Sequence, residues 1–429
     1  MILANGKIYE SSEQNAVLDR LEAEINDTRA GLVLDVETVI SAADTLGKKI
    51  AEGEFNNIIL EFLGDIPNEY LKLAADFMNG DNLRYRIAEE LGKDFSAGQT
   101  ITPPYGLKQA TVKLMPLGTL FHIAAGNMDG LPAFSVMEGL LTGNVNILKL
   151  PQADNGLTIE IFRKLIEIEP KLAPFIYVFD TPSSDVSAMK KMAEFSDGII
   201  VWGGDAAVSA VRALAPTGTK LIEWGHKLGF AYISGYENKD SELSALAKHI
   251  IDTRQLLCSS CQTIFIDTED MTDVTSFCGE FLPYLEAAER ENPITEVGAV
   301  AEMSLRRYTE QLEGYVDKKS SDKQIFQGGR CSLTACEDSV LELSYMYGNC
   351  LVKRLPQREI MTVLRQSKGY LQTAGLICTA DKRGELTDIL ARAGVNRIMR
   401  AGNMSVTFCG EAHDGEYPLR RYMRIVNIE

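Results

Sequence analysis

The sequence lacks a long hydrophobic run and an excess of basic residues. No uncharged stretch approaches the roughly 20 apolar residues that would span a bilayer, and residues 1–15 carry charges instead of the unbroken apolar segment of a secretory signal. Lysine and arginine total 43 against 60 aspartates and glutamates, a formal net charge of −17, which opposes the basic surface needed to bind a phosphate backbone. We therefore expect a soluble, cytoplasmic protein with no membrane span and no nucleic-acid partner.

Histidine and cysteine are too scattered for a metal centre or a disulfide framework. The eight cysteines are spread mostly singly over 429 residues, and the four histidines are dispersed. The pair Cys258-x-x-Cys261 has no second pair at the spacing that structural zinc sites use. We therefore expect reduced thiols and no bound metal.

The chain is long enough for two or three domains, and we predict two. Apolar residues recur at helical spacing in 36–52, 68–77 and 83–91, and a stretch rich in glycine and proline follows at 94–106. Beyond it, short apolar runs at 120–124, 145–148, 176–179 and 198–201 alternate with helical patterns at 133–141, 156–168, 186–195 and 206–214. A second series has runs at 263–267, 374–377 and 397–399, and helical patterns at 271–290 and 385–393. Both series predict α/β units, the first with a mostly parallel, doubly wound sheet.

Ligands bind such sheets outside the carboxyl ends of the strands, often on backbone amides at a helix N-terminus. Two segments fit this pattern: Gly203-Gly204-Asp205 and residues 126–130 each follow a predicted strand and precede a predicted helix. Neither is a G-x-G-x-x-G fingerprint, and a plain connecting loop is the alternative for both.

Cys258 lies between a helical pattern and a short β-rich run. The position suits a thiol nucleophile, but a buried structural cysteine is equally consistent with the residue type. A thioredoxin-like pair would stand at the start of a helix, whereas this pair precedes a predicted strand.

The neighbouring residues resemble the aldehyde dehydrogenase superfamily, and most closely the acyl-CoA (fatty acid) reductases of the LuxC type. The resemblance covers about residues 115–267. It is carried by Gly126-Asn127 before Gly130-Leu131-Pro132-Ala133, by Asn146-Ile147-Leu148-Lys149, by Val201-Trp202-Gly203-Gly204-Asp205, by Glu223-Trp224-Gly225-His226-Lys227, and by Gln255-Leu256-Leu257-Cys258-Ser259-Ser260 before Gln262. The tail His413-Asp414-Gly415, with Arg420, Arg421 and Arg424, also looks like the LuxC-type terminus.

The resemblance implies a role for each matching residue. Cys258 would carry the acyl group as a thioester, and the Asn127 side chain with the Cys258 backbone N–H would stabilise the oxyanion. Lys149 would bind the adenosine ribose of a nicotinamide cofactor. Gln152 stands where NAD-preferring relatives often carry a glutamate that repels a 2′-phosphate, so NADPH is expected and NADH stays possible. Trp202, Gly203 and Gly204 complete the cofactor-binding set.

Several of these assignments keep a structural alternative. Asn127 also suits a left-handed turn, and Lys149 also suits a solvated strand end. Trp202 also suits plain packing. Glu223 matches the glutamate that activates water for deacylation in oxidising relatives, but an enzyme that releases aldehyde should not hydrolyse its acyl intermediate. Glu223 would instead accept the proton of Cys258 or help proton transfer to the aldehyde oxygen, and an ion pair in a strand is an equal alternative. Cys261 is either a spectator or the partner of Cys258 in a reversible disulfide.

Together these features predict an aldehyde dehydrogenase-like α/β protein. We expect a cofactor domain with a helical N-terminal region over 1–226, a catalytic domain over 227–400, and a C-terminal segment over 401–429 packing near the domain interface. The expected reaction is reduction of a fatty acyl-CoA or other acyl thioester to the aldehyde with NADPH. An acyl-phosphate reductase, an aldehyde-oxidising dehydrogenase and a non-catalytic nucleotide-binding relative are the alternatives. The resemblance also implies an acyl-CoA or acyl-protein donor, an acyl-protein synthetase as partner, and a homo-oligomer.

Overall fold

The computed structural model describes residues 1–64, 68–93, 95–124, 130–152, 154–316 and 323–429. The chain forms two compact units: unit 1 comprises Met1–Gly225 with Phe408–Glu429, and unit 2 comprises His226–Thr407. The last residues of the chain therefore belong to the same unit as the first. Within the described ranges, no helix is long and apolar enough to cross a membrane.

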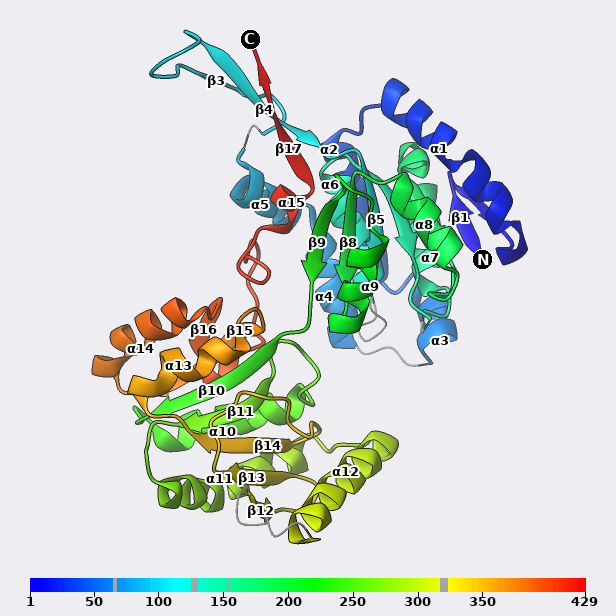
Figure 1. The fold of residues 1–429 in the computed structure, drawn as a ribbon. Helices are drawn as coiled ribbons and strands as arrows, with labels where there is room; N and C mark the ends of the chain where they lie inside the picture. Colours follow the sequence, from blue (N-terminus) through cyan, green and yellow to red (C-terminus); the bar gives the residue numbers. More distant parts are fainter. Residues whose placement is uncertain (65–67, 94, 125–129, 153, 317–322) are drawn as a thin grey trace. The chain divides into compact units, whose positions relative to one another are not determined.

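Unit 1 is built on a seven-stranded sheet with the order β2-β1-β7-β6-β5-β8-β9 (Figure 1). Its strands are β1 (Ile2–Ala4), β2 (Lys7–Tyr9), β5 (Thr119–Ile123), β6 (Val145–Lys149), β7 (Ile176–Phe179), β8 (Gly198–Trp202) and β9 (Lys220–Trp224). From β7 to β9 all neighbours are parallel, whereas β1 and β2 are antiparallel additions at one edge. The doubly wound sheet predicted from the sequence is confirmed, and its strand order reverses between β5 and β8, where such folds bind ligands.

Helices connect the parallel strands of unit 1, as the alternating pattern predicts. They are α6 (Leu131–Leu141), α7 (Leu157–Ile168), α8 (Val186–Glu194) and α9 (Asp205–Leu214). The 3.6-residue period gives α7 one apolar face, because Ile159, Phe162 and Leu165 recur at helical spacing and are all buried. A short 3₁₀ segment, Pro170–Phe175, leads from α7 into β7.

The N-terminal region of unit 1 is helical, but it also contains strands that the sequence did not predict. Its helices are α1 (Gln14–Gly31), α2 (Val36–Ala51), α3 (Asn56–Leu63), α4 (Asn68–Met78) and α5 (Gly80–Leu91). Asp35 caps α2 by accepting the Thr38 N–H, and Asn79 caps α5 by accepting the N–H groups of Asp81 and Asn82. β1 and β2 are only three residues long, which is too short to show an alternating pattern.

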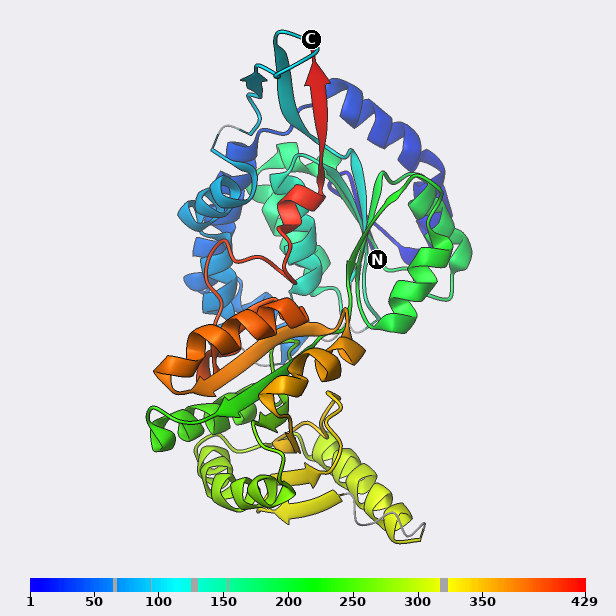
Figure 2. The same cartoon turned by 60° about the vertical axis from the view of Figure 1, so that its left-hand side comes forward.

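The glycine- and proline-rich stretch leads into a three-stranded antiparallel sheet with the order β17-β4-β3. β3 (Gln99–Ile101) and β4 (Ala110–Pro116) form a hairpin, and β17 (Met423–Ile428) pairs with the other side of β4. Figures 1 and 2 both show the C-terminal strand lying beside β4 in unit 1.

A buried charge cluster attaches the C-terminal segment to the helices of unit 1. The Arg86 guanidinium of α5 contacts both Glu90 and Glu138 of α6, whose side chains are fully buried. Tyr422 donates its hydroxyl to Glu138 at 3.0 Å, and Glu90 accepts the Leu419 N–H of α15 (Pro418–Arg421) at 2.8 Å. Burial lowers the pKa of Arg86, but the two carboxylates outweigh it and raise that pKa overall. The arginine therefore stays charged. Its positive charge offsets the two buried carboxylates that bind the C-terminal segment.

Unit 2 has its own seven-stranded sheet with the order β12-β13-β14-β11-β10-β15-β16. The strands are β10 (Leu228–Ser234), β11 (Cys261–Ile266), β12 (Lys323–Gln327), β13 (Ser332–Cys336), β14 (Asn349–Arg354), β15 (Leu371–Cys378) and β16 (Arg397–Arg400). All neighbours are parallel except β12 with β13. Predicted strands correspond to β11, β15 and β16. β10 and β13 were not predicted, because Gly229 in β10 and Ser332 and Thr334 in β13 break the apolar runs that mark the other buried strands.

Helices lie on both faces of the sheet of unit 2, so side chains from one strand enter two different cores. The helices are α10 (Lys239–Asp252), α11 (Met271–Glu291), α12 (Val297–Val316), α13 (Ile360–Leu364) and α14 (Ala380–Ala393). Ala231 and Ile233 of β10 pack with residues of α10 and α11, whereas Phe230 and Tyr232 pack with residues of α13 and α14. This division follows from the two-residue period of a strand.

Candidate active site

The predicted site residues fall in both units. Those assigned to the cofactor, together with Asn127 and Glu223, belong to unit 1, and Cys258 belongs to unit 2. Asn127 lies outside the described residues, as do the neighbouring positions 125–129. The residues of each unit are therefore described within that unit.

Cys258 lies in an exposed turn that joins α10 to β11. The Ser260 N–H donates to the Leu257 carbonyl at 2.9 Å, and the Ser260 hydroxyl accepts the Leu257 N–H at 3.1 Å. The Ser259 hydroxyl is bonded to the Ser405 hydroxyl at 2.8 Å. These bonds fix the turn on both sides of Cys258, so its thiol is accessible at a defined place on the amino side of the sheet.

Cys261 has a different environment, because it is the first residue of β11 and its side chain is 0 % exposed. Its thiol donates to the Thr263 carbonyl at 3.6 Å. All eight cysteines lie in the described part of the chain, and none of them forms a disulfide. An exposed thiol and a core thiol three residues apart form an asymmetric pair, and only the exposed one can reach a substrate directly.

The chain approaches Cys258 through strained backbone. Six residues other than glycine have positive φ in the described part of the chain, and four of them are Arg254 (50°), Gln255 (62°), Met346 (58°) and Tyr347 (47°). Each left-handed non-glycine residue costs about 1–2 kcal/mol, so it persists only where surrounding contacts impose it. The two strained segments contact each other directly, because the Tyr347 N–H donates to the Arg254 carbonyl at 3.0 Å.

The other end of the Cys258 turn is bonded to a neutral histidine. The Cys261 N–H donates to Nε2 of His249, a residue of α10 that is 5 % exposed, at 3.3 Å. Burial lowers the pKa of His249 to about 4 although Asp252 opposes the shift. The imidazole is thus unprotonated at neutral pH, as an acceptor of this N–H must be.

In unit 1, Lys149 ends β6 at the carboxyl edge of the parallel sheet, as expected. It is paired in register with Ile123 of β5 and Phe179 of β7. The side chain is only 4 % exposed, and its ammonium donates to the Ser183 hydroxyl at 2.9 Å. Burial lowers the pKa of Lys149, with Asp180 acting against the shift. A buried ammonium is not the solvated lysine of the structural alternative, and it presents donors at the edge where ligands bind.

The Gly203-Gly204 turn follows β8 at the same edge. Gly204 is the N-cap of α9 and has ordinary backbone angles, φ −73° and ψ 176°. A Cβ atom placed on Gly204 would meet no protein atom within 4 Å. The fold itself therefore does not demand glycine there, whereas a ligand approaching the backbone N–H groups would. The acidic Asp205 in the first turn of α9 weakens an anion site at this terminus, so Lys149 is the stronger candidate for binding an anionic ligand.

Trp202 ends β8 and packs among aromatic rings. Its indole N–H donates to the Ser135 hydroxyl at 3.0 Å, and its ring lies 5.6 Å from Trp224 and 5.2 Å from His413 between centroids. His413 also stacks edge-on against Trp224 at 4.9 Å. The packing alternative for Trp202 agrees with these contacts. They also bring the C-terminal segment to the carboxyl ends of β8 and β9, a neighbourhood that the sequence pattern of the tail did not reveal.

Gln152 is exposed in the turn that follows β6 and Lys149. Its role toward a cofactor stays a prediction. Glu223 of β9 instead forms a two-bond ion pair with Arg212 of α9, with N–O distances of 2.5 and 2.6 Å. This pair agrees with the structural alternative for Glu223. Its partner is Arg212, and the sequence neighbours His226 and Lys227 belong to the other unit.

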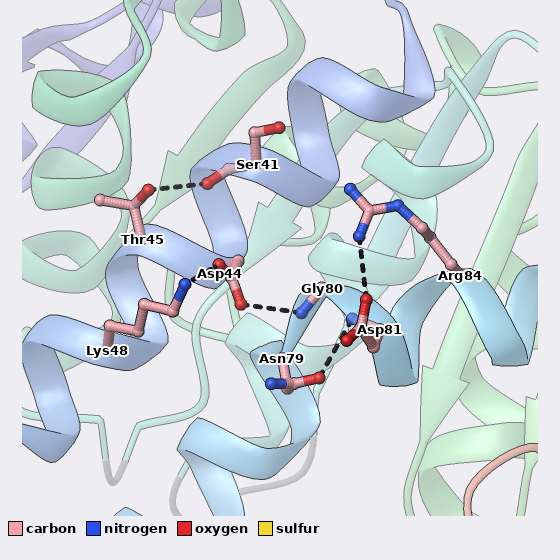
Figure 3. Close-up of a pocket in the computed structure, with 8 residues that line it drawn as sticks. All are labelled: Ser41, Asp44, Thr45, Lys48, Asn79, Gly80, Asp81 and Arg84. Carbon is pink, nitrogen blue, oxygen red and sulfur yellow. Dashed lines mark hydrogen bonds and ion pairs between the residues drawn. The ribbon is translucent and has the colours of Figure 1, made fainter.

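A hollow of about 320 Å³ lies elsewhere in unit 1, between α2 and α5. Figure 3 shows that its charged side chains face one another: Lys48 pairs with Asp44, and Arg84 pairs with Asp81. None of the predicted site residues lines it. Among the residues that the structure describes, no group of three histidine, cysteine or acidic side chains could hold a metal ion.

Comparisons with known proteins identify the family of the chain. The sequence model of the family described as acyl-CoA reductase (LuxC) matches residues 33–425. A long-chain acyl-protein thioester reductase from Photobacterium leiognathi is 22% identical over 416 residues, which cover 92% of this chain and 83% of the relative. Its counterpart from Vibrio harveyi is 22% identical over 413 residues, with the same two coverages.

Solved structures support the fold. The NADP-dependent glyceraldehyde-3-phosphate dehydrogenase from Bacillus halodurans aligns with a TM-score of 0.71 and 14% identity, covering 100% of this chain and 98% of that one. Lactaldehyde dehydrogenase from Escherichia coli aligns with a TM-score of 0.70 and 14% identity, covering 98% and 91%. The predicted aldehyde dehydrogenase-like α/β fold is confirmed.

Proposed function

Because the chain belongs to the acyl-CoA reductase (LuxC) family of oxidoreductases, we propose that it reduces a fatty acyl thioester to the aldehyde through an acyl group held on Cys258. The observation that carries this proposal is the contrast between the two neighbouring thiols. Cys258 is exposed on a bonded turn, whereas Cys261 is fully buried in β11. The names of the relatives add a long-chain acyl-protein thioester as a donor beside acyl-CoA.

The chemistry begins at the sulfur of Cys258. Its thiolate attacks the thioester carbonyl, the carbon–sulfur bond to the donor breaks, and the donor leaves as a thiolate while the acyl group stays on Cys258. A bound reduced nicotinamide supplies the hydride that the acyl carbon requires. Collapse of the resulting tetrahedral oxyanion releases the aldehyde and regenerates the Cys258 thiolate. The Cys258 backbone N–H and the Asn127 side chain are the proposed oxyanion donors.

Residues of unit 1 fit a nicotinamide cofactor, and we propose NADPH. Lys149 offers a buried ammonium at the carboxyl edge, and Gly204 leaves space for a ligand at the start of α9. Gln152 is neutral and exposed beside this edge, so a 2′-phosphate would meet no like charge from that side chain. The aligned glyceraldehyde-3-phosphate dehydrogenase from Bacillus halodurans is a complex with NADP, which supports the same choice.

Glu223 takes no part in the proposed steps. Arg212 binds both of its carboxylate oxygens, which suits a strand residue held in an ion pair. An enzyme that releases aldehyde gains nothing from a base that activates water, because hydrolysis would discharge the acyl group from Cys258 as the acid.

Purified protein tests the proposal directly. With acyl-CoA or an acyl-protein and NADPH, we expect loss of reduced-cofactor absorbance, and without cofactor we expect an acyl adduct on Cys258 by mass spectrometry. Cys258→Ala should abolish both signals and still bind NADPH, whereas Cys261→Ala serves as the matched control and should keep most activity. No adduct and no cofactor consumption by the wild-type protein would contradict the proposal. Turnover of acyl phosphate or aldehyde alone would assign the reaction to one of the alternatives.

The biological setting stays a prediction. An acyl-protein synthetase would supply acyl groups to Cys258, and the family resemblance implies a homo-oligomer in the cytoplasm. Co-purification with such a synthetase and size-exclusion chromatography with light scattering would test the two associations.

A further inference from the structure

The segment around Cys258 is held by two buried glutamine side chains and one serine. We propose that Gln255, Gln262 and Ser344 form a clamp that positions the Cys258 turn for acyl transfer. The inference rests on the proposed function in which Cys258 carries the acyl group. Gln255 is a positioning residue in this scheme, because it acts on the reacting sulfur only through the turn.

Gln255 closes the loop that contains Cys258. Its side chain is 1 % exposed, and its amide nitrogen lies 2.9 Å from the Cys261 carbonyl oxygen and 3.0 Å from the Ser344 hydroxyl. Its amide oxygen accepts the Gly348 N–H at 3.0 Å. Since Gln255 precedes the turn and Cys261 follows it, this one side chain sets the separation of the two ends.

Gln262 completes the clamp from the opposite end. Its amide nitrogen donates to the Gln255 carbonyl at 2.7 Å, and its amide oxygen accepts the Ser344 hydroxyl at 2.8 Å. Ser344 therefore bonds both glutamines, and the two ends of the turn are tied to each other and to a third segment.

The third segment is itself anchored in the core of unit 2. Met346, Tyr347 and Gly348 form three consecutive left-handed residues with φ values of 58°, 47° and 78°. The Asn349 amide nitrogen donates to the Met346 carbonyl at 2.8 Å, and the Asn349 amide oxygen accepts from Arg307 of α12 at 2.8 Å. Arg307 is 4 % exposed. A chain of contacts thus runs from Arg307 of α12 through the left-handed turn to the clamp.

A plain connection between a helix and a strand does not require so many buried hydrogen bonds and left-handed residues. Buried amides and left-handed residues are costly, and they gather at sites where position matters more than stability. The position of the reacting sulfur relative to the carbonyl carbon must be correct to about half an ångström. A displacement of about 1 Å can slow such a step about 100-fold. The clamp supplies that precision without touching the substrate.

The test compares Gln255→Met with a matched core variant in the full-length protein. Methionine keeps the approximate volume of glutamine and removes the hydrogen bonds of its side-chain amide, while the backbone carbonyl still accepts from Gln262. Leu386→Ala is the control, since Leu386 is fully buried in α14 and packs on the other face of the sheet. Amide hydrogen exchange of a peptide covering residues 254–262 should become at least about tenfold faster in Gln255→Met and stay unchanged in Leu386→Ala.

Acylation of Cys258 provides the second readout. The rate constant for adduct formation should fall about 30-fold in Gln255→Met, while the acyl-thioester concentration giving half-maximal rate changes less than about threefold. Ser344→Ala should act in the same direction, and the double variant should be little worse than either single one, because the residues act as one unit.

The outcomes separate this inference from the proposed function. Unchanged exchange in Gln255→Met refutes the clamp. Faster exchange with an unchanged acylation rate refutes the positioning role, because the contacts then serve only the fold. If the wild-type protein forms no adduct, the proposed function fails, and the exchange comparison still decides whether the clamp holds the turn.

Discussion

Acidification should weaken unit 2 through His249, the histidine that accepts the Cys261 N–H. Its pKa is about 4 in the folded protein because the ring is buried, against about 6.5 in an unfolded chain. The unfolded state therefore binds more protons below pH 6.5, and stability falls as the pH falls towards 4. Linkage gives a loss of about 2 kcal/mol between pH 7 and pH 5, rising to about 3 kcal/mol below the folded pKa.

Urea unfolding at pH 7 and pH 5, followed by NMR at the imidazole C2–H signals, measures this loss. The chain has only four histidines, so the individual signals can be resolved. His249→Gln should remove the share of this loss that His249 causes, because an amide oxygen accepts the same N–H without titrating. Carboxylates whose pKa is lowered in the fold, such as those of Asp252 and Asp338, still weaken unit 2 in acid. His122 supplies the control, because it is buried in unit 1 and burial also lowers its pKa to about 4. Substitution of His122 should leave the pH dependence of the urea midpoint of unit 2 unchanged. Both tryptophans lie in unit 1, so fluorescence reports that unit separately.

Two results would refute the reasoning about His249. One is a titration midpoint of its C2–H signal at or above pH 6, which would mean that burial does not disfavour the charged ring. The other is an identical urea midpoint of unit 2 at pH 7 and pH 5.

Three further predictions follow from contacts in unit 1. Lys149→Ala should raise the NADPH dissociation constant about tenfold, as loss of a charged hydrogen bond does, and fluorescence titration would measure it; unchanged affinity would move the cofactor elsewhere. Glu223→Gln and Arg212→Gln should behave alike, each costing no more than about 1 kcal/mol of stability and little turnover; a large loss of turnover in Glu223→Gln alone would restore a catalytic role. Arg86→Met should cost about 3–5 kcal/mol because two buried carboxylates lose their cation, and proteolysis within residues 408–417 should accelerate; the exposed-pair variant Arg163→Met is the control in thermal melts.

Local patterns were sufficient for most of the fold. Helices α2, α7 and α11 bury one face at a 3.6-residue period, and that period is written in the sequence. Strands β6 and β7 are short apolar runs between helices, a pattern that is typical of a parallel sheet. The strands β1 and β2 escaped because three residues are too few to carry a period, and β13 escaped because Ser332 and Thr334 break its apolar run.

The candidate site also has features that the sequence predicts and features that only the structure shows. Cys258 and Lys149 are read from motif residues at fixed places in the chain, and the structure adds that one thiol is exposed and the ammonium is buried. The ion pair of Glu223 with Arg212 was not readable, because the partner lies eleven residues earlier on a helix that folds back beside β9. The clamp on Gln255 joins residues about 90 positions apart.

By itself the sequence determined the family, the α/β class, and which cysteine is the candidate nucleophile. Those features are encoded locally, in residue types, spacings and hydrophobic periods. Only the tertiary structure decided that Cys261 belongs to the core, that His249 accepts its N–H, and that Ser344 and Gly348 hold Gln255. Side chains from distant segments meet only when strands and helices pack, and no pattern within one segment records what it will pack against.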